Sequence, residues 1–502
     1  MLQSIAYAVF QIKNLILNFL STHAMHLAER WQPMFNLSGY QVLPEPHLLF
    51  NNFAQDVHPL RGLVKHGPYS QSIGFPQKIR PALIAPKGEM AKLLGLLQEL
   101  ASSQVVKDAA NYYPPYPGFQ QAFRIPIIIP DDELRIEFTS SYNDASPNYG
   151  PVLIDEIISA LGPLRINRNN FDVLLLYLPI QWKKVFEYEG FDLHDGLKAR
   201  LAPIGIPVQI INDMALTRKC RANVMWGISI ALYAKSGGVP WKLADLNKDE
   251  AYIGISYTIK KMDSSQLYVT CCSQVFDPDG TGFEFVAYDA KEFSTDRKGN
   301  PYLSYHEMQS VLSKSLTIYQ SRHTGRIPQK VYIHKSSHFT DEEIQGAYDT
   351  FGNKTEVELV QIVRKSRWYG IKIANPKSDK HSHPAAAYPQ DRGTYLPISK
   401  NECLLWTQGS VFGVNVQNAS REVFKEAALK PLPDPILLRR FSGEGGWHET
   451  CSSILGLTKM DWNNNTLYKT IPVTLGYSQI FAEVVKRDAS LTSRTYDYRF
   501  FM

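Results

Sequence analysis

The stretch from His194 to Lys235 reads HDGLKARLAPIGIPVQIINDMALTRKCRANVMWGISIALYAK, and the rest of the chain is interpreted around it. His194 and Lys198 are four residues apart, so on a helix they share one face. Gln209 stands in the apolar run IPVQII, which predicts a buried strand. Lys235 ends the apolar helix pattern VMWGISIALYA just before Gly237. Strand and helix connections therefore bring two lysines, a histidine and a glutamine back toward one place, where they can converge on an anion.

Taken singly, these residues have ordinary explanations. A Lys and a His four apart usually mark a solvated helix face, and a lysine at a helix end interacts favourably with the helix dipole. The whole string, however, resembles the MID domain of Argonaute proteins, and the following AKSGGVPWKL resembles their junction between MID and PIWI. In that family a tyrosine or histidine, two lysines and a glutamine grip the 5′ phosphate of a guide strand. The resemblance assigns these roles to His194, Lys198, Gln209 and Lys235, and a histidine in the first place points to the short prokaryotic branch.

The composition is compatible with such a protein without establishing it. A chain of 502 residues allows two to four domains, and a hydrophobic content of 44% is ample for their cores. The net charge of +5 is mildly basic, which suits a nucleic-acid binder. Five cysteines, an odd number without regular spacing, argue against a disulfide scaffold and predict a reducing, cytoplasmic location.

Residues 1–24 are apolar but fit neither a secretion signal nor a membrane span. No positive charge precedes Lys13, as a signal peptide would require. Polar residues interrupt the apolar run that a spanning helix needs, namely Gln11, Lys13, Asn14 and Asn18. We expect an amphipathic extension, or a start codon assigned too early with Met25 as the true start. A membrane or partner helix is the minor alternative.

The remaining patterns predict an α/β chain with a Rossmann-like MID domain followed by an RNase H-like PIWI domain. FDVLLLYLPI at 171–180 is a continuous apolar run, as expected of a buried parallel strand. After residue 250, three strands, a helix, a strand and a helix are predicted, which is the order of an RNase H-like fold. We expect an N-terminal extension at 1–41, a segment that packs on PIWI at 42–105, MID at 106–237 and PIWI at 238–502.

The resemblance also implies a PIWI domain that does not cut nucleic acid. Cleavage of the RNase H type needs acidic side chains that hold two magnesium ions about 4 Å apart. The matching positions hold Ser256 in IGIS, Ser336 in a KSS turn and Gln479 on the C-terminal helix, which are weak magnesium ligands. No catalytic residue is therefore assigned, and the chain is not expected to be an enzyme. The alternative is an active nuclease that uses acidic residues elsewhere in the chain.

The chain ends in TYDYRFFM, and an exposed tail would rarely end in three apolar residues. In Argonautes the C-terminus folds back into the MID pocket, where its carboxylate helps to bind a divalent ion that bridges guide phosphates. The resemblance assigns this role to Met502. Mg²⁺ suits such a site because it takes few protein oxygens and keeps phosphate and water ligands. This Mg²⁺ is expected to be structural and not catalytic.

Two further segments have open interpretations. KSDKHSHP at 377–384 contains His381 and His383 beside Asp379, which is either a metal site or, more often, a polar loop. RKSRWY at 364–369 alternates basic and aromatic residues, as single-strand binders do. The same pattern is also typical of an edge strand protected by charge.

Membership of the family would imply that the chain loads a small 5′-phosphorylated guide RNA and pairs it with complementary single-stranded DNA of an invader. It would then activate an effector in antiviral or anti-plasmid defence. That effector carries an APAZ region and an NAD-hydrolysing domain, sirtuin-like or TIR, and we favour the sirtuin-like partner. No effector domain is recognised in this sequence, so we expect it on another chain, and we expect no membrane partner. A stand-alone nucleic-acid binder without an effector is the remaining alternative.

Overall fold

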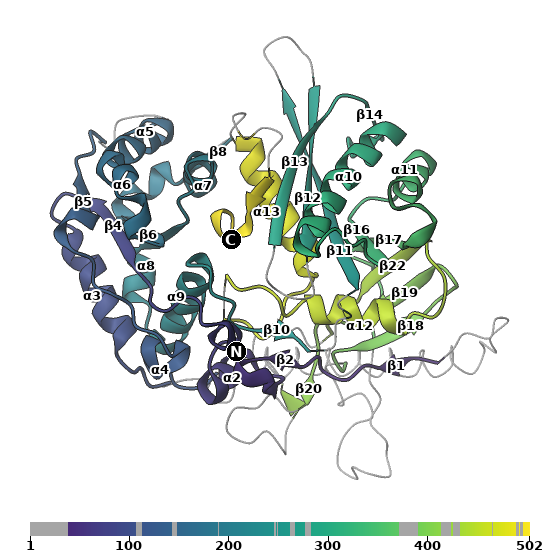
Figure 1. The fold of residues 1–502 in the computed structure, drawn as a ribbon, viewed down its shortest axis with the longest axis horizontal. Coiled ribbons are helices and arrows are strands. Elements are labelled where there is room, and N and C mark those ends of the chain that lie inside the picture. The colour runs from purple at the N-terminus through teal and green to yellow at the C-terminus, as the bar shows by residue number, and fades with distance from the viewer. Residues whose placement is uncertain are drawn as a thin grey trace, which may run out of the picture.

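The computed structural model describes residues 39–106, 113–142, 148–188, 190–244, 247, 249–261, 267–276, 283–370, 390–412, 423–424, 432–463, 465–487, 491 and 495–502. For residues 260–261, 267–276, 283, 412 and 423–424 it describes the backbone alone. The predicted extension at 1–41 and the KSDKHSHP segment fall almost wholly outside these residues. The described chain forms two lobes, at the left and right of Figure 1, and the C-terminus lies between them.

The left lobe is built on a four-stranded parallel sheet in the order β5-β4-β6-β9. Its strands are β4 (Pro81–Pro86), β5 (Arg135–Phe138), β6 (Val173–Leu178) and β9 (Val208–Asn212). Its main helices are α3 (Met90–Ala101), α5 (Gly150–Ala160), α7 (Leu193–Leu201) and α9 (Arg221–Lys235), with shorter ones at α4 (Phe119–Phe123), α6 (Gly162–Ile166) and α8 (Asp213–Thr217). Parallel strands need such crossover helices, which cover the faces of the sheet.

Both faces of this sheet are buried, which explains the unbroken apolar run of β6. Leu174 and Leu176 pack in the cluster that contains α5 and α7. Leu175 and Tyr177 pack in the cluster that contains α3 and α9. All six residues of β6 are buried, so the predicted buried parallel strand is confirmed, as is the Rossmann-like character of this lobe.

The predicted domain boundary at residue 105 is wrong. Strand β4 and helix α3 lie before that residue, yet β4 pairs in parallel with both β5 and β6. The left lobe therefore begins at β4 and not at residue 106. Strand β4 has the sequence PALIAP, a short apolar run that begins and ends in proline. Such a pattern can predict a strand, but it does not indicate which other strands pair with it. Only its pairing with β6 assigns it to this lobe.

The first part of the segment before β4 pairs with strands of the right lobe. Strand β1 (Gln41–Val42) pairs with β18 (Thr394–Pro397) at the edge of the large sheet. Strands β2 (Leu48–Leu49) and β3 (Gln55–Asp56) form a small sheet with β10 (Lys242–Leu243). Helix α2 (Pro59–His66) follows, and the side chain of His58 accepts hydrogen bonds from the first helical N–H groups.

The right lobe contains a ten-stranded mixed sheet in the order β1-β18-β19-β22-β17-β16-β11-β12-β13-β23. Its other strands are β11 (Glu250–Lys261), β12 (Leu267–Phe276), β13 (Phe283–Ala290), β16 (Lys330–Lys335), β17 (Glu356–Val363), β19 (Glu402–Leu405), β22 (Ile436–Ser442) and β23 (Thr495–Asp497). Its helices are α10 (Tyr305–Arg322), α11 (Asp341–Phe351), α12 (His448–Leu457) and α13 (Val473–Arg487). Short pairs are formed by β14 (Phe293–Thr295) with β15 (Pro301–Leu303) and by β20 (Val411–Phe412) with β21 (Val423–Phe424), and in the left lobe by β7 (Glu187–Tyr188) with β8 (Phe191–Asp192).

Within this sheet, β13-β12-β11-β16-β17 is the RNase H-like core. Strands β11, β12 and β13 form an antiparallel meander, whereas β16 and β17 run parallel to β11. The chain order of three strands, α10, β16, α11 and β17 is the predicted one, so the RNase H-like fold class is confirmed. Helix α11 begins with a capping box between Thr340 and Glu343, which satisfies backbone N–H groups of its first turn.

Strand β11 divides its residues between the two faces of the sheet. Ala251, Ile253 and Ile255 pack in the cluster that contains α10 and α11. Gly254 faces α13, where a Cβ atom would lie 2.1 Å from the carbonyl oxygen of Thr474. Helix α13 therefore begins directly over β11, and only a glycine permits this approach.

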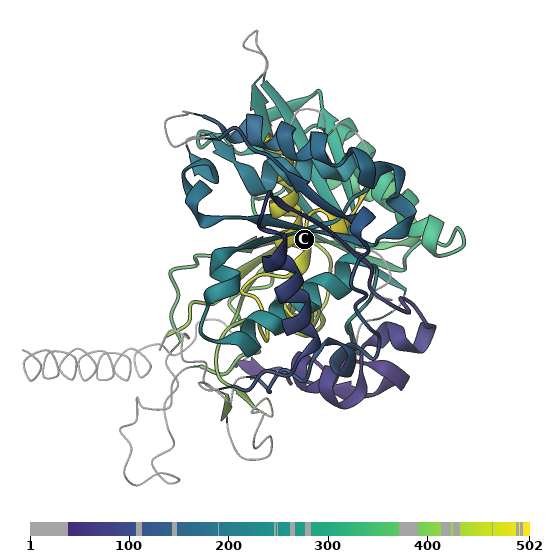
Figure 2. The same ribbon diagram turned by 90° about the vertical axis from the view of Figure 1, so that its left-hand side faces the viewer.

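A single apolar core joins the two lobes. It contains side chains of α3 and α9 from the left lobe together with side chains of α13 and the last residues of the chain. Figure 2 shows the C-terminus in the middle of the molecule when the left lobe faces the viewer. None of the described helices is both long enough and apolar enough to cross a membrane.

Candidate functional site

Two buried lysines from the left lobe lie close together where the lobes meet. Lys198 on α7 is 2% exposed, and its Nζ donates a hydrogen bond to the carbonyl oxygen of Phe501 at 2.7 Å. Lys235, the last residue of α9, is 3% exposed and donates to the carbonyl oxygen of Val208 and to Oε1 of Gln209, both at 2.8 Å. Within the described part of the chain, neither ammonium group forms an ion pair. The structure thus brings Lys198, Gln209 and Lys235 together, as the sequence predicted.

The surroundings of these lysines disfavour their charged forms. Burial lowers the pKa of Lys198 to about 8, although the charges of Asp195 and Asp192 act in the opposite direction. Burial also lowers the pKa of Lys235 well below its usual value, and the nearby charge of Lys198 adds to this effect. Two adjacent ammonium groups with neutral acceptors leave the pocket short of negative charge. An anion that entered it would stabilise both charged lysines.

The C-terminal residues form one wall of this pocket. After a turn at Tyr498–Phe500, the N–H of Met502 donates to the carbonyl oxygen of Tyr498 at 3.1 Å. Phe501 and Met502 are each 1% exposed, so the apolar ending is buried, as predicted. The carboxylate of Met502 follows directly after the carbonyl group that Lys198 binds. The chain end thus lies one residue beyond a Lys198 contact, although no ion pair joins the carboxylate to either lysine in the described chain.

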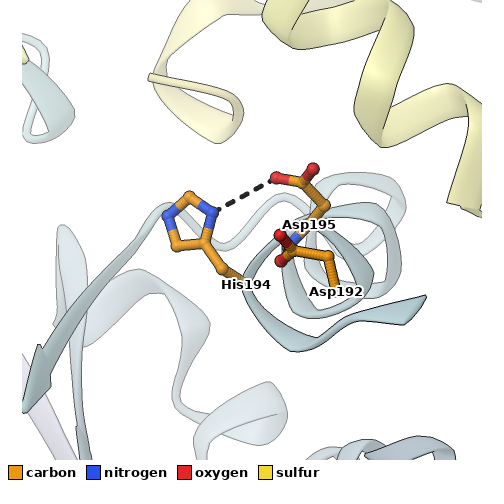
Figure 3. A group of neighbouring side chains, drawn as sticks. All are labelled: Asp192, His194 and Asp195. Atoms are coloured by element: carbon orange, nitrogen blue, oxygen red, sulfur yellow. Dashed lines mark hydrogen bonds and ion pairs between the residues drawn. The ribbon is translucent and has the colours of Figure 1, made fainter. Parts of the chain in front are cut away.

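His194 lies at the rim of the pocket, one helical turn before Lys198. Its side chain is 54% exposed, and its Nδ1 lies 3.2 Å from Oδ1 of Asp195. Partial desolvation and the charge of Lys198 lower the pKa of His194, so the imidazole is neutral near pH 7. A neutral imidazole can donate one hydrogen bond and accept another. Figure 3 shows the ring of His194 directed at the Asp195 carboxylate, with Asp192 beside them at the start of α7.

Asp192 and Asp195 were not found by sequence reasoning. Asp192 caps α7 by accepting a hydrogen bond from the N–H of Asp195 at 3.0 Å. The possible ligand atoms of Asp192, His194 and Asp195 lie within 4.8 Å of one another. Within the described residues, this is the only group of three or more such side chains close enough to share an ion. The sequence DLHDG carries the signal of a helix N-cap, which is sufficient to explain Asp192 without a ligand.

Arg487, at the end of α13, is another cation that sequence reasoning missed. Burial raises the pKa of Asp195, but the hydrogen bond to His194 and neighbouring positive charges, Arg487 among them, lower it overall, so Arg487 lies near Asp195. The Nε of Arg487 is buried and has no hydrogen-bond partner among the described residues. In the sequence, Arg487 is only a basic residue at a helix end, and such residues are too common to indicate that it lies near the pocket.

A hollow of about 730 Å³ opens beside Gln209. One wall is a face of α9, where Gly227 and Ala231 recur at helical spacing and lead down to Lys235. The rim carries amide side chains, and Asn465 reaches across from the right lobe to donate to the carbonyl oxygen of Asn223 at 2.9 Å. The apolar face of α9 can contact a planar base, and the amide side chains at the rim can hydrogen-bond to it. Lys235 lies where a phosphate joined to that base would be bound.

Comparison with known proteins gives matches of fold. No protein-family model matches the chain, and no curated protein sequence matches it. The structure is similar to that of Clostridium butyricum Argonaute bound to a guide DNA and a 19-mer target DNA, with 13% identity, a TM-score of 0.61, and coverage of 92% of this chain and 54% of that one. It is also similar to A. aeolicus Argonaute (15% identity, TM-score 0.56, coverage 92% and 56%) and to Drosophila Piwi (12% identity, TM-score 0.58, coverage 92% and 55%).

The chain has the Argonaute fold. The Rossmann-like lobe is the MID domain of that fold, and the RNase H-like lobe is its PIWI domain. The chain spans about half the length of the Argonaute and Piwi structures that it matches. The lysine pocket lies at the junction of MID and PIWI.

On the PIWI sheet, the predicted catalytic positions carry neutral side chains. The Oγ of Ser256 lies 2.8 Å from the Oγ of Ser478 on α13, and both side chains are buried. Gln479, which the sequence places at the third catalytic position, is half-buried and follows the serine that actually touches Ser256. Ser336 is exposed just after β16, and its carbonyl oxygen accepts a hydrogen bond from Gln361. Among the residues that the structure describes, the hydrogen bond between the Ser256 side chain and α13 is to a serine hydroxyl and not to a carboxylate.

Proposed function

We propose that this chain is a guide-binding subunit of the Argonaute type that does not slice its target. The observation that supports this most directly is the pair of buried lysines, Lys198 and Lys235, held at the MID–PIWI junction without an ionic partner in the described chain. A 5′ phosphate carries the negative charge that this pocket lacks. The adjoining hollow next to Gln209 accepts the first nucleotide.

Recognition of a phosphate is chemically reasonable here because the two ammonium groups lie close enough for the charge of Lys198 to act on Lys235. Each charge-assisted hydrogen bond from a lysine to a phosphate oxygen contributes about 1.5–3 kcal/mol. Gln209 orients Lys235, and the neutral His194 supplies a further hydrogen bond at the rim. A guide with a 5′ hydroxyl would leave both ammonium groups buried without a counter-charge.

The test is the double substitution Lys198→Ala, Lys235→Ala. The affinity for a 5′-phosphorylated guide should fall by well over tenfold in a direct binding assay, whereas the weaker binding of a 5′-hydroxyl guide should change little. Substitution of the exposed Lys291 and Lys298 by Ala is the matched control and should leave both affinities unchanged. Equal losses for the two guides would show that these lysines do not form a phosphate pocket.

A structural Mg²⁺ is part of the proposal. The terminal carboxylate of Met502, one residue beyond the carbonyl group that Lys198 binds, would provide one hard oxygen, and the guide phosphates and water would provide the others. The ion would offset the repulsion between the carboxylate and the phosphates. The carbonyl oxygen of Phe501 already accepts a hydrogen bond from Lys198. The terminal carboxylate is therefore the oxygen group at the chain end that remains to bind the ion, and a carboxylate is a suitable ligand for Mg²⁺.

The absence of slicing is proposed from the serine contact on the PIWI sheet. With guide, matched target and Mg²⁺ or Mn²⁺, we expect the target to remain intact on a denaturing gel. Replacing Ser256 and Ser336 by Asp should not create cleavage, because the remaining metal ligands and their supporting groups are missing as well. Guide-directed cuts by the unmodified chain would instead favour a nuclease that uses other acidic residues.

Target recognition and effector activation complete the proposal. With a guide RNA in place, base pairing reads the invader DNA while the protein holds the backbone. Pairing would shift a conformational equilibrium that a partner with an APAZ region senses, and its sirtuin-like domain (or TIR domain) would then hydrolyse NAD in the cytoplasm. Measuring NAD after adding guide and target to the purified complex tests this step. NAD levels unchanged by target would leave a stand-alone nucleic-acid binder as the better description.

A further inference from the structure

The segment Arg364–Tyr369 forms an anchored loop that presents basic and aromatic side chains to solvent. Arg364, Lys365 and Arg367 are exposed, and Trp368 and Tyr369 are 49% and 64% exposed. None of these five side chains makes a hydrogen bond or an ion pair within the part of the chain that the structure describes. Because these charged and aromatic side chains are exposed and make no such contacts in the described chain, they are available to bind a ligand.

The backbone of this loop is held in place by neighbouring residues. The Oγ of Ser366 donates to the carbonyl oxygen of Pro435 at 2.8 Å and accepts from the N–H of Trp368 at 3.3 Å. Gly370 packs so closely on the buried indole of Trp406 that a Cβ atom would lie 2.6 Å from that ring. The exposed side chains therefore stand on a fixed frame. This favours a binding surface over the alternative of a charged edge strand, since residues 364–369 lie in no strand.

The loop lies at the edge of the sheet where Ser336 lies. It follows β17, which runs parallel to β16 with Gln361 opposite Lys335. The side chain of Gln361 donates to the carbonyl oxygen of Ser336 at 3.0 Å. The carboxyl ends of parallel strands in an α/β sheet are the usual place for ligands. The loop therefore lies at the same end of the sheet as Ser336, one of the three positions that the sequence aligns with catalytic residues.

Two hollows lie between this loop and the lysine pocket, and both are lined by residues between α12 and α13. Arg364 lines a second hollow, of about 210 Å³, together with Lys469 and the α13 residues Gly476 and Ile480. The connection between α12 and α13 borders both hollows, because Asn463 and Asn465 line the one beside Gln209 while Asp461 and Lys469 line this one. At its other end, α13 carries Arg487, which lies near Asp195 at the rim of the lysine pocket.

We propose that Arg364–Tyr369 is a second nucleic-acid contact, which binds the single-stranded guide downstream of its 5′ end. The basic side chains would neutralise guide phosphates, and Trp368 and Tyr369 would stack on unpaired bases. From Gly476 to Arg487, α13 is about 16 Å long at 1.5 Å per residue. A stacked strand rises about 3.4 Å per nucleotide along its axis, so a guide that is anchored at Lys198 and Lys235 and follows α13 reaches the loop after about five nucleotides. This inference rests on the proposed function.

The test compares short and long 5′-phosphorylated single strands, of about three and about eighteen nucleotides, on either side of that reach. The variant Arg364→Gln, Lys365→Gln, Arg367→Gln should bind the long strand at least tenfold more weakly and the short strand normally. The dependence of log affinity on log salt should fall by about 2 for three lost phosphate contacts. The separate variant Trp368→Ala, Tyr369→Ala should weaken binding of the long strand by about tenfold with the salt dependence unchanged.

A charge-matched control is Arg297→Gln, Lys298→Gln, Arg326→Gln, which removes three exposed positive charges from turns outside this surface. It should bind both strands normally. If the Arg364 variant binds the long strand as well as this control does, the second contact is wrong. The lysine-pocket variant would still lose the short strand in that case, so failure of this inference is distinguishable from failure of the proposed function.

Discussion

At the scale of single residues, the pocket depends on two lysines whose burial is unfavourable in the free protein. A buried ammonium group without a negative partner loses hydration that neutral carbonyl acceptors replace only in part. Lys198 and Lys235 remain where they are because α7 and α9 are fixed by the cores on both sides of the MID sheet. A phosphate that entered the pocket would relieve this unfavourable burial, and the proposed guide binding would include that free energy.

The depressed pKa of Lys198 predicts a specific dependence of stability on pH. This pKa is about 8 in the folded chain and 10.5 in the ordinary environment of an unfolded one. Between these values the unfolded state binds more protons, so the free energy of unfolding rises with pH, by about 3 kcal/mol for this group. Relative to Lys198→Met, the wild-type protein should therefore gain stability in urea titrations as pH increases from 7 to 10.5. The same pH dependence in both proteins would contradict the burial of a charged Lys198.

At the scale of elements, the PIWI site is organised by the contact of α13 with β11. Gly254 lets the first turn of the helix approach the strand, and this approach brings Ser478 to Ser256. His334 on β16 also contacts the first turn of α13, because its Nδ1 lies 2.9 Å from Oγ1 of Thr474. Burial lowers the pKa of His334 to about 3, so the ring stays neutral beneath the helix. The contact between β11, β16 and the first turns of α13 is therefore made by hydroxyl groups and a neutral imidazole.

The close approach predicts that Gly254→Ala is strongly destabilising. The added methyl group would lie 2.1 Å from a backbone oxygen of α13, so either the helix or the strand must move. We expect a loss of about 3 kcal/mol in the free energy of unfolding, measured by denaturant titration. Gly95→Ala is the control, because this position on α3 has open space around it and alanine should stabilise the helix by up to about 1 kcal/mol. Equal effects at the two sites would mean that α13 is not docked so closely.

At the scale of the whole molecule, the last residues of the chain complete a site that begins some three hundred positions earlier. Phe501 packs in the core shared by the two lobes, and its carbonyl oxygen is the acceptor for Lys198. Strand β23 closes the edge of the PIWI sheet just before this tail. The tail therefore links the order of the PIWI sheet to the geometry of the MID pocket.

This arrangement predicts that the C-terminus must remain free. A tag fused after Met502, which is 1% exposed, should weaken the affinity for a 5′-phosphorylated guide, and EDTA should weaken the untagged protein similarly. A chain that ends in a Met502 amide is the sharper variant, because it keeps the buried side chains and removes only the terminal charge. An N-terminal tag should not affect loading. If the tag, the amide and EDTA all leave guide affinity unchanged, the carboxylate does not hold an ion, although the lysine pocket would stand.

The sequence by itself determined several of the secondary elements, the class of both domains and three of the pocket residues. Apolar periodicity is a local property, so β6, β9, α9 and α10 could be predicted from it. Lys198, Gln209 and Lys235 were identified because their motif resembles a family, not because their spacing requires convergence.

Only the tertiary structure decided the remaining features, because they depend on contacts between residues far apart in the chain. Strand β4 joined the MID sheet through pairing with a strand ninety positions later. Ser478, not Gln479, met Ser256 because the rotation of α13 over Gly254 determines which side chain points at the sheet. The carbonyl of Phe501 became a ligand of Lys198 because the apolar tail is driven into the core between the lobes, and no local pattern specifies where such a tail is buried.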